Sequence, residues 1–546
     1  MKNKIKIALL LDSHTINQWE HQLIKELIKL DDVSINLVIL NTMKTPPSSQ
    51  NWKTILYDAY LKLDKYVFKV KANAFEKRNI EETLNMVERM TVSPLSQDGI
   101  NVLSSKEVSQ IKSKNLDIII QLGSKTVKGD ILNASSYAMW SYLYSDNRLI
   151  SGQSDGFWEV LNGIGVTGSV LEIVTNNSNK NRVIARTSSK TDELSISRNR
   201  NTYAWKLASF LPRKVKELTL VGEKDFFKEI DYQYSYPQFY SNRLYHKTNL
   251  NNLEMFSLLL QHLFKIFKTK LYHKFVLEQW ILLFEFKEEV SSSFAKFKKL
   301  IPPKDRFYAD PFVVYENNKY YLFIEELPYI TNKGHISVLE INKKGEWSEP
   351  VKIIDESYHL SYPYIFKEHG NYFIIPESGA NRTIDLYKCT KFPFQWEFQM
   401  NLMNNIRAVD TTLFFYEKKC WMFCNMAEHK GASTNDELFL FYADKVETVD
   451  WTPHPLNPIV SDATKSRPAG KIFIYNDKII RPSQNSSKLY GYGLTMNEIL
   501  VLNEHEYKEV RIEDIEPNWD RQVTRTHTFN HSEGLTIIDG KLKRKR

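Results

Sequence analysis

The sequence predicts an α/β domain followed by an all-β domain built from repeated blades. About the first 200 residues alternate strand and helix patterns, whereas short aromatic and β-branched strands with frequent turns follow residue 280. This second part repeats at a period of roughly 50 residues, which is the period of a propeller blade. A chain of 546 residues has room for about three domains at roughly 100–200 residues each.

Four segments of the N-terminal part carry these patterns. Residues 5–11 form a buried apolar run, residues 19–30 repeat apolar side chains at helical spacing, and residues 33–40 and 116–122 are further strand-like runs. This order predicts a Rossmann-like sheet of parallel strands. No Gly-x-Gly-x-x-Gly motif follows the first strand, so we do not expect a dinucleotide site of the usual kind.

A helical linker is predicted between the two domains. Residues 253–276 place apolar side chains at helical spacing, with four lysines interspersed. One interpretation is a helix packed between two domains, and the other is a helix that lies in a membrane interface. We therefore expect an α/β domain over residues 1–205, a helical linker over residues 206–276 and a propeller over residues 277–546.

Five copies of the repeat predict a five-bladed β-propeller. Each copy has a strand, a turn that contains Asn, Gly, Lys or Asp, and a second strand, as a β-hairpin requires. The copies begin at Ala309, Ser361, Val409, Ser466 and Thr526. Residues 279–286 (QWILLFEF) precede the first copy, and we expect them to supply an outer strand that closes the ring against the last blade.

The repeats place polar side chains at one shared position. In a propeller the innermost strand of every blade lines the central channel, so equivalent residues should converge on one funnel. The aligned copies have Asp310, Tyr362, Asp410, Arg467 and His527 at this position. A second polar set follows at the end of the next strand and consists of Glu325, Glu326, Glu377, Asn425 and Gln484. Packing alone would place small or apolar residues there.

These residue types point to acid–base chemistry and to the binding of a phosphate or carboxylate group. Carboxylates in a partly desolvated cleft can hold different pKa values, so one can act as an acid and another as a base. Asp310, Asp410 and Glu377 are therefore the catalytic candidates. The candidates for substrate binding are Glu325, Glu326, Tyr362, Arg467 and His527. Arg467 and His527 suit phosphate groups. The alternative interpretation is a buried polar network whose members bond only one another.

Composition restricts the classes of function. The net charge of +8 is mild for this length, and a nucleic-acid binder would need a denser basic face. Three cysteines are too few for a disulfide framework, and the apolar run at the start is shorter than a signal-peptide core. We expect a cytoplasmic protein, with the inner face of the membrane as a further site and no nucleic-acid partner. No metal ligands are assigned, and dependence on a divalent metal is left open.

Several ordered motifs of the propeller part resemble a known family. At ADPF, HLSYPYIF, IIPES, VDTTLF, SRPAG and HTFN the sequence resembles the N-terminal propeller of plant glucosamine inositolphosphorylceramide transferases and bacterial proteins linked to surface-polysaccharide synthesis. The similarity covers about residues 277–540. The architecture is also similar to that of arabinanase and fructosidase glycosidases. Their catalytic triad does not transfer, because Asp310 is present but Tyr362 and Asp410 stand in blades two and three.

Residues 1–205 resemble the N-terminal fold of formyltransferases. That family has an Asn-x-His segment where this chain reads Ser141-Tyr142-Leu143, and the stretch VTNNSNKNR lacks the expected acid. The departure implies that the domain is not an active formyltransferase, because the chemistry needs the Asn, the His and an Asp. The same resemblance implies either a degenerate ligand pocket or a structural role for Asp146, Asn147, Arg148, Trp158 and Glu159.

The resemblance implies a glycosyltransferase-like enzyme of cell-surface polysaccharide, capsule, lipopolysaccharide or glycolipid biosynthesis. A nucleotide sugar would be the donor, and a glycan or glycolipid would be the acceptor, with peripheral membrane contact as a further expectation. No cofactor is assigned. Two alternatives stand beside this one: a non-catalytic glycan-binding or scaffold protein of the same pathway, and a glycoside hydrolase of arabinanase-like architecture.

Overall fold

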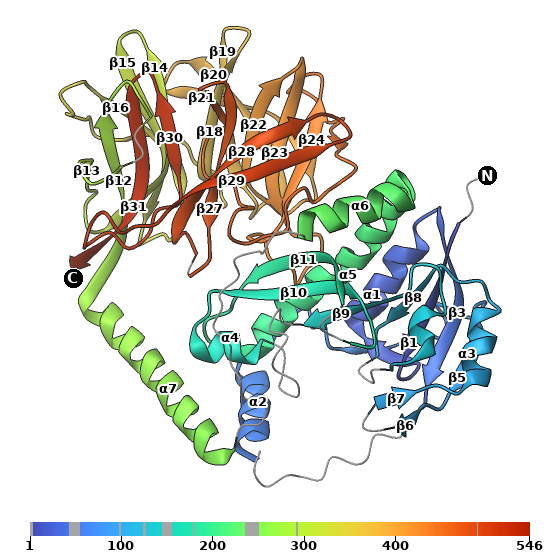
Figure 1. The fold of residues 1–546 in the computed structure, drawn as a ribbon. Coiled ribbons are helices and arrows are strands. Elements are labelled where there is room, and N and C mark those ends of the chain that lie inside the picture. The colour runs from blue at the N-terminus through green and yellow to red at the C-terminus, as the bar shows by residue number, and fades with distance from the viewer. Residues whose placement is uncertain are drawn as a thin grey trace. The chain divides into compact units, whose positions relative to one another are not determined.

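The computed structural model describes residues 4–42, 55–97, 100–123, 127–144, 156–177, 181–234, 251–290, 293–488 and 490–546. The chain divides into two compact units, drawn in Figure 1. The first consists of Met1–Thr187, Thr191–Gln261 and His429–Ala432, and the second of Ser188–Lys190, His262–Glu428 and Ser433–Arg546.

The N-terminal unit contains a sheet in which seven described strands follow the order β11-β10-β9-β8-β1-β3-β5. Strand β1 pairs in parallel with β3 on one side and with β8 on the other, which confirms the expected parallel α/β architecture. The strands are β1 (Ile5–Leu11), β3 (Val33–Asn41), β5 (Glu88–Val92), β8 (Ile118–Gln121), β9 (Met139–Tyr144), β10 (Val166–Ile173) and β11 (Arg182–Lys190). Short strand pairs join β2 (Thr15–Asn17) to β4 (Lys77–Asn79) and β6 (Leu95–Gln97) to β7 (Ile100–Val102).

Both faces of this sheet are buried, as an all-apolar parallel strand requires. Successive side chains of β1 alternate between the two faces: Leu9 packs with α1 (Gln18–Ile28) and α5 (Ile196–Val221), whereas Leu10 packs with α3 (Ser105–Lys112). Helix α1 begins after Asn17, whose side chain forms a capping box with Glu20. The remaining short helices are α4 (Phe157–Asn162) and the 3₁₀ helix over Asp130–Asn133.

The segment that we expect to be a linker is helical. It contains the second half of α5, then α6 (Glu223–Tyr234) and α7 (Asn252–Phe275). The boundary expected after residue 205 falls inside α5, because the buried side chains of this helix continue to Leu218 in the core of the N-terminal unit. Within the described ranges, no helix combines the length and apolar character needed to cross a membrane.

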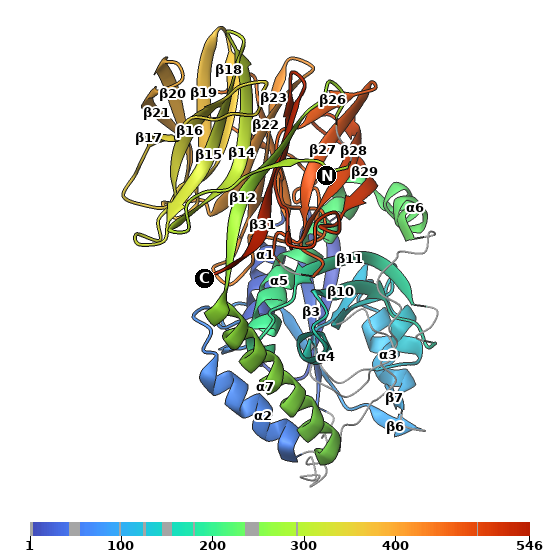
Figure 2. The same ribbon diagram turned by 90° about the vertical axis from the view of Figure 1, so that its left-hand side faces the viewer.

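Five four-stranded sheets form the propeller within the described residues, as expected from the five repeats (Figures 1 and 2). Blade 1 has β14 (Arg306–Glu316), β15 (Lys319–Pro328), β16 (His335–Ile341) and β17 (Val351–Ile354). Blade 2 has β18 (Ser361–Glu368), β19 (Asn371–Ser378), β20 (Thr383–Lys391) and β21 (Gln395–Asn404). Blade 3 has β22 (Ala408–Tyr416), β23 (Lys419–Met426), β24 (Leu438–Ala443) and β25 (Thr452–Pro453). Blade 4 has β26 (Phe473–Tyr475), β27 (Lys478–Asn485), β28 (Gly493–Leu502) and β29 (Tyr507–Ile515).

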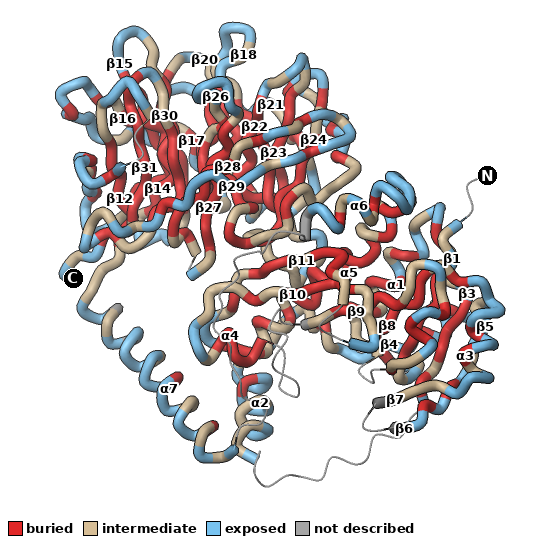
Figure 3. The backbone as a smooth tube through the Cα atoms, in the orientation of Figure 1, coloured by how far each residue is buried: buried red, intermediate tan, exposed pale blue. Residues whose placement is uncertain are grey.

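Blade 5 joins distant parts of the chain and closes the ring. Its inner strands β30 (Phe529–Ser532) and β31 (Leu535–Lys545) come after blade 4, whereas β12 (Val276–Phe286) and β13 (Lys298–Leu300) come before blade 1. Strand β12 pairs with β31 over its whole length, which confirms the expected closing strand. Figure 3 shows that buried residues run along the strands of every blade, so the cores lie between neighbouring sheets.

Candidate active site at the propeller axis

The inner strands of three blades share one backbone irregularity. In blades 1, 2 and 3 the register with the second strand shifts across residues 309–312, 361–364 and 409–412. Asp310, Tyr362 and Asp410 lie inside these shifts, and their φ angles of 49°, 43° and 51° are in the left-handed region. Such bulges re-aim side chains, and unfavourable φ angles persist only where the surrounding structure fixes them. The bulges thus present the predicted residues of three blades in the same way.

The residues predicted at the axis come together in one buried group. His527 and Arg467 reach the carboxylates of Asp310 and Asp410 respectively, and the backbone N–H of Tyr362 donates to Asp310 over 3.3 Å. We use the name axial cluster for Asp310, Glu325, Tyr362, Glu377, Asp410, Arg467 and His527. Every member is buried except Glu377, which is intermediate.

Asp310 is held between the first and the last blade. Its Oδ1 accepts a 2.7 Å hydrogen bond from the Thr528 hydroxyl and lies 3.7 Å from Nδ1 of His527. Burial raises the pKa of Asp310 to about 6, and the nearby carboxylates of Asp539 and Asp410 add to this rise while His527 opposes it. A carboxyl group with this pKa changes its protonation state close to neutral pH, as acid–base catalysis requires.

His527 stacks on an aromatic side chain and forms an ion pair with an acid. Its ring lies 4.1 Å from the Trp280 ring, centroid to centroid, at an interplanar angle of 19°. Nδ1 of His527 contacts Oδ2 of Asp539. Burial alone would lower the pKa of His527, but the carboxylates of Asp539 and Asp310 outweigh burial and raise it. The cation and Trp280 therefore form one side of the axial cluster.

Asp310, His527 and Asp539 could together hold a metal ion by their types and positions. One ligand atom from each lies within 4.8 Å of the others. Asp539 is already committed, however, because its Oδ1 accepts hydrogen bonds of 2.8 and 3.0 Å from the backbone N–H groups of His527 and Thr528. The same carboxylate is thus also part of a hydrogen-bonded network with the backbone.

Arg467 is the second cation of the cluster and connects three acceptors. Nε contacts Oδ2 of Asp410, Nη2 lies 3.2 Å from the other oxygen of Asp410, and Nη1 donates to Asn435 over 2.8 Å. Nη2 also reaches Glu377 at 3.5 Å. The guanidinium carbon lies 5.0 Å from the centroid of the Tyr490 ring. This bidentate pairing occupies the fork that we expect to hold a phosphate.

Two glutamates carry raised pKa values beside these charges. Burial and the neighbouring carboxylates hold the pKa of Glu325 well above its ordinary value. The pKa of Glu377 is also well above its ordinary value, because burial and Asp410 outweigh the opposing effect of Arg467. Glu325 lies 3.3 Å from His359. The cluster therefore holds more acids than cations and retains protons that exposed carboxyl groups would lose.

The hydroxyl of Tyr362 is hydrogen-bonded inside the propeller, where the side chain is fully buried. Its hydroxyl accepts a 2.7 Å hydrogen bond from the backbone N–H of Gly470 and shares a 2.9 Å hydrogen bond with Thr412. Burial holds the pKa of Tyr362 well above its ordinary value. The phenol thus connects blades 2, 3 and 4 in its neutral form.

Glu326 does not lie with the axial cluster. Its carboxylate accepts 2.7 Å hydrogen bonds from Arg306 and from Ser337, and it lies 3.3 Å from His335. Side chains alternate along a strand, so of the two neighbouring acids one joins the axis and the other points away. The expected role of Glu326 in substrate binding at the axis is therefore corrected: Glu326 belongs to an ion pair inside blade 1.

Sequence reasoning missed four contributors. Asp539, Thr528, Asn435 and Tyr490 contact the expected residues directly. Asp539 ends the second apolar run of the last repeat (TIIDG), so a polar residue at that point was a usable signal. Asn435 and Tyr490 lie in irregular segments between strands, where the repeat gives no register.

The N-terminal candidates have separate outcomes. Asp146, Asn147 and Arg148 lie outside the described residues. Trp158 and Glu159 lie on α4, where both are buried and Trp158 packs with Phe157. In the segment aligned with Asn-x-His, Tyr142 is buried and its hydroxyl donates to the backbone oxygen of Leu207 over 2.8 Å. These contacts are those of a packed core.

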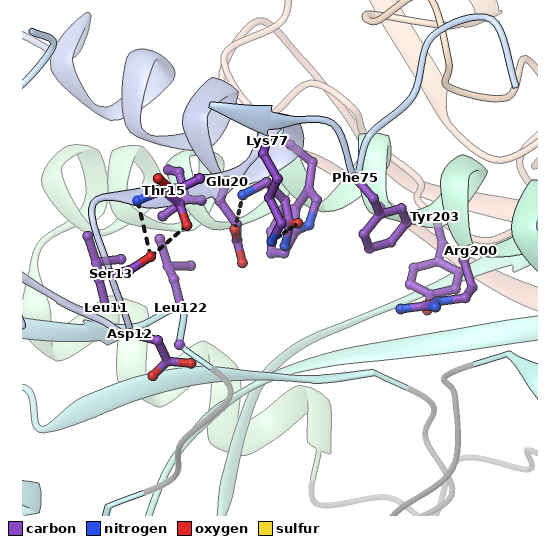
Figure 4. A pocket seen from close by; sticks show the side chains of 15 residues that line it. Leu11, Asp12, Ser13, Thr15, Glu20, Phe75, Lys77, Leu122, Arg200 and Tyr203 are labelled. Atoms are coloured by element: carbon purple, nitrogen blue, oxygen red, sulfur yellow. Dashed lines mark hydrogen bonds between the residues drawn. The ribbon is translucent and has the colours of Figure 1, made fainter. Parts of the chain in front are cut away.

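The N-terminal unit has a cavity that the sequence did not indicate (Figure 4). It measures about 340 Å³ and lies beyond the carboxyl ends of β1 and β8, where Asp12 and Gly123 follow the two strands. Strand order reverses at this point, which is where open parallel sheets usually bind ligands. Arg200 and Tyr203 of α5 form another wall, and burial raises the pKa of Glu20 to about 7.

The propeller part is similar in sequence to a described family. Residues 297–531 match the model of "Glucosamine inositolphosphorylceramide transferase 1, N-terminal". Glucosamine inositolphosphorylceramide transferase 1 of Arabidopsis thaliana is 31% identical over 209 residues, and the protein of that name from Oryza sativa subsp. japonica is 32% identical. The match covers 38% of this chain and 27% and 28% of the two relatives. The chain thus matches about a quarter of the length of these relatives.

Solved structures overlap with less than half of the chain. Zg3597, a family 117 glycoside hydrolase of Zobellia galactanivorans, shares 11% identity at a TM-score of 0.32, over 48% of this chain and 90% of the hydrolase. Glycinamide ribonucleotide transformylase 1 of Symbiobacterium toebii shares 12% identity at a TM-score of 0.27, over 39% of this chain and 86% of the transformylase.

Proposed function

We propose that this protein acts in the transfer of a sugar from a nucleotide donor to a glycolipid acceptor, and that the axial cluster of the propeller is its reaction centre. The family whose model matches residues 297–531 and the Arabidopsis thaliana relative are both named as glucosamine inositolphosphorylceramide transferase 1, and inositolphosphorylceramide is a lipid. The main support is the environment of Asp310, whose carboxyl group has its pKa raised to about 6 and lies beside the buried cation of His527. The proposal extends to the cytoplasmic face of a membrane as the site of the reaction.

Asp310 is the proposed base for the acceptor hydroxyl. Deprotonated Asp310 can accept the hydroxyl proton, while His527 beside it stabilises the carboxylate. Glu377 is the most exposed member of the cluster, with 16% of its side chain accessible, and is the proposed contact for sugar hydroxyls. Arg467 would exchange one of its present acceptors for a donor phosphate, because its fork suits phosphate oxygens as well as a carboxylate.

A second candidate function is favoured because the polar side chains of the axial cluster already bond one another. Asp410 already accepts hydrogen bonds from Arg467 and from Gln484, the latter over 2.8 Å, and Tyr362 is fully buried. Side chains whose hydrogen bonds are already made to one another can have a purely structural role in the propeller. In that case the protein would be a non-catalytic glycan-binding or scaffold protein of the same pathway.

One experiment separates the two functions. Purified protein is incubated with labelled nucleotide sugars and a lipid extract, and labelled lipid is measured for the wild type, Asp310→Asn and Asp477→Asn. Asp477 is an exposed turn residue of blade 4 with φ of 61°, so its variant is a matched control for a lost carboxylate at a left-handed position. Product from the wild type and Asp477→Asn, but not from Asp310→Asn, supports the transferase. Equal product from the wild type and both variants overturns the role of Asp310, and saturable glycan binding without product supports the scaffold.

A further inference from the structure

Helix α7 carries an exposed stripe of apolar side chains. Eight large apolar side chains, each between 45% and 77% exposed, lie along it: Leu253, Phe256, Leu260, Leu263, Phe264, Phe267, Leu271 and Phe275. At 3.6 residues per turn they fall within an arc of about 120°. The stripe extends from the first turn of the helix to the last. Single exposed apolar residues are common on protein surfaces, but an aligned row of eight needs an explanation.

A different face of α7 already has a packing partner. Met255 is 1% exposed and lies in a small core with Phe157 and Trp158 of α4, and Leu258 and Leu259 pack against the same core. These three residues point away from the stripe on the helix circumference. Residues of α2 (Ile55–Val67) join this core as well. The contacts of α7 inside the N-terminal unit therefore leave the stripe uncovered.

The charge of α7 identifies the partner. The sequence from Met255 to Phe275 contains four lysines and no acidic residue. Lys268 borders the stripe, Lys274 lies within its arc in the last turn of the helix, and both are exposed. An apolar face rich in Phe and Leu beside lysines is the pattern of a helix that lies in a membrane interface, with its apolar side among the acyl chains and its cations at anionic headgroups. Figure 3 shows α7 largely as an exposed helix.

We propose that α7 docks the protein onto an anionic lipid bilayer through this stripe. The helix lies parallel to the surface, the phenylalanines enter the acyl boundary, and Lys268 and Lys274 contact the headgroups. Four charged residues in the second half of the helix argue against a spanning arrangement: Lys265, Lys268, Lys270 and Lys274. Membrane docking needs no catalytic group. The docking proposal is therefore independent of the proposed sugar transfer, and either one can be wrong while the other is right.

The test is flotation of the full-length protein with vesicles. One set contains phosphatidylcholine alone, and the other contains phosphatidylcholine with phosphatidylglycerol. We expect the wild type to float with the anionic vesicles and to be released partly by salt, because salt screens lysine contacts. The double variant Phe264→Glu/Phe267→Glu should bind at least tenfold more weakly. Lys268→Gln/Lys274→Gln should weaken binding to anionic vesicles more than to neutral ones.

A matched control keeps the test specific. Phe394→Glu replaces an aromatic residue of the propeller that is 45% exposed, and it should float like the wild type. Circular dichroism establishes that each variant is folded. The proposal is overturned if the wild type does not float, or if Phe264→Glu/Phe267→Glu floats unchanged. It is also overturned if light scattering shows a dimer that this variant converts to a monomer while vesicles bind neither form, because the stripe would then contact a second copy.

Discussion

The carboxylate of Asp310 lies 3.7 Å from Nδ1 of His527, so the first and the last repeat of the propeller meet at the axis. The ring is closed twice, by strand pairing between β12 and β31 and by this polar contact between the inner strands. Thr528 adds a 2.7 Å hydrogen bond to Asp310 at the same point. Residues that we propose for catalysis therefore also join the two ends of the ring, and the predictions below separate these roles.

Replacement of Asp310 should reduce sugar transfer without unfolding the protein. Asn keeps the size of the side chain and tolerates the left-handed backbone at this position. Loss of a general acid or base lowers a rate by roughly 10²–10⁴-fold, so initial rates of lipid labelling should fall by at least the lower of these factors. Rates equal to the wild type, measured on folded protein, would leave Asp310 with a structural role only.

The contribution of Asp310 to the stability of the propeller should decrease as pH rises from about 4 to about 6. The pKa of Asp310 is raised from 3.8 to about 6, so the folded state binds this proton more tightly than the unfolded state. Its contribution is present below pH 3.8 and is lost as pH rises to about 6, which corresponds to about 3 kcal/mol. The raised pKa values of Glu325 and Glu377 act with the same sign. Thermal midpoints at stepped pH should show this slope, and Asp310→Asn should flatten it.

Arg467 should be more important for stability than an exposed arginine. Arg467→Lys keeps the charge but loses the two-pronged contact with Asp410, so the free energy of unfolding should fall by about 2 kcal/mol. Arg467→Ala should cost about 3–5 kcal/mol, because it leaves Asp410 buried without its cation. Arg511→Lys, at an exposed pair with Asp514, should cost less than about 1 kcal/mol. Denaturant titrations measure all three, and equal costs would contradict this account.

Gly470 should not tolerate a side chain. A Cβ atom there would lie 1.9 Å from the backbone oxygen of Phe529, and φ is 131°. Gly470→Ala should therefore destabilise the protein by more than about 4 kcal/mol or prevent folding. Gly370→Ala is the control, since φ is 81° but no atom lies within 4 Å, and it should cost only about 1–2 kcal/mol. Similar thermal midpoints for both variants would show that the backbone at Phe529 can move away from the added methyl group.

No formyl transfer is expected from the N-terminal domain. Leu143 stands where the formyltransferase family has its histidine, and it lies within β9 beside the buried Tyr142. A hydrocarbon side chain cannot move a proton. Purified protein supplied with a formyl-folate donor and amino sugars should release no deformylated folate above the rate of a blank, as measured by absorbance. Turnover would show that the alignment of Ser141 to Leu143 is incorrect.

The repeat predicted most of the propeller fold because each blade is built from the same sequence pattern. A strand, a turn and a second strand recur at Ala309, Ser361, Val409 and Ser466, and each copy starts a described blade. The polar residue after the start of each copy predicted the axis for the same reason. The domain boundary expected after residue 205 falls inside α5, because the helical pattern of this segment continues across that point to Val221.

The finer part of the site needed coordinates. The pair Glu325 and Glu326 is ambiguous in sequence, because a shift of one residue turns a strand side chain to the other face. The bulge at Asp310 makes the count along the strand uncertain. Asn435 reaches Arg467 from a loop outside the repeat, and no local pattern predicts such a contact. The number of residues between two polar positions in the sequence does not determine whether they contact each other across different blades.

The pairing of β12 with β31 also sets the order of events during synthesis. The ribosome makes β12 before blades 1 to 4 and makes β31 after them, so β12 must wait for its partner until the chain is almost finished. During that time its run of apolar residues (WILLF) presents an unpaired edge, which is the kind of strand that nucleates aggregation. Nascent chains that stall before β31 should therefore depend on chaperones, whereas completed chains protect the same strand by closing the ring.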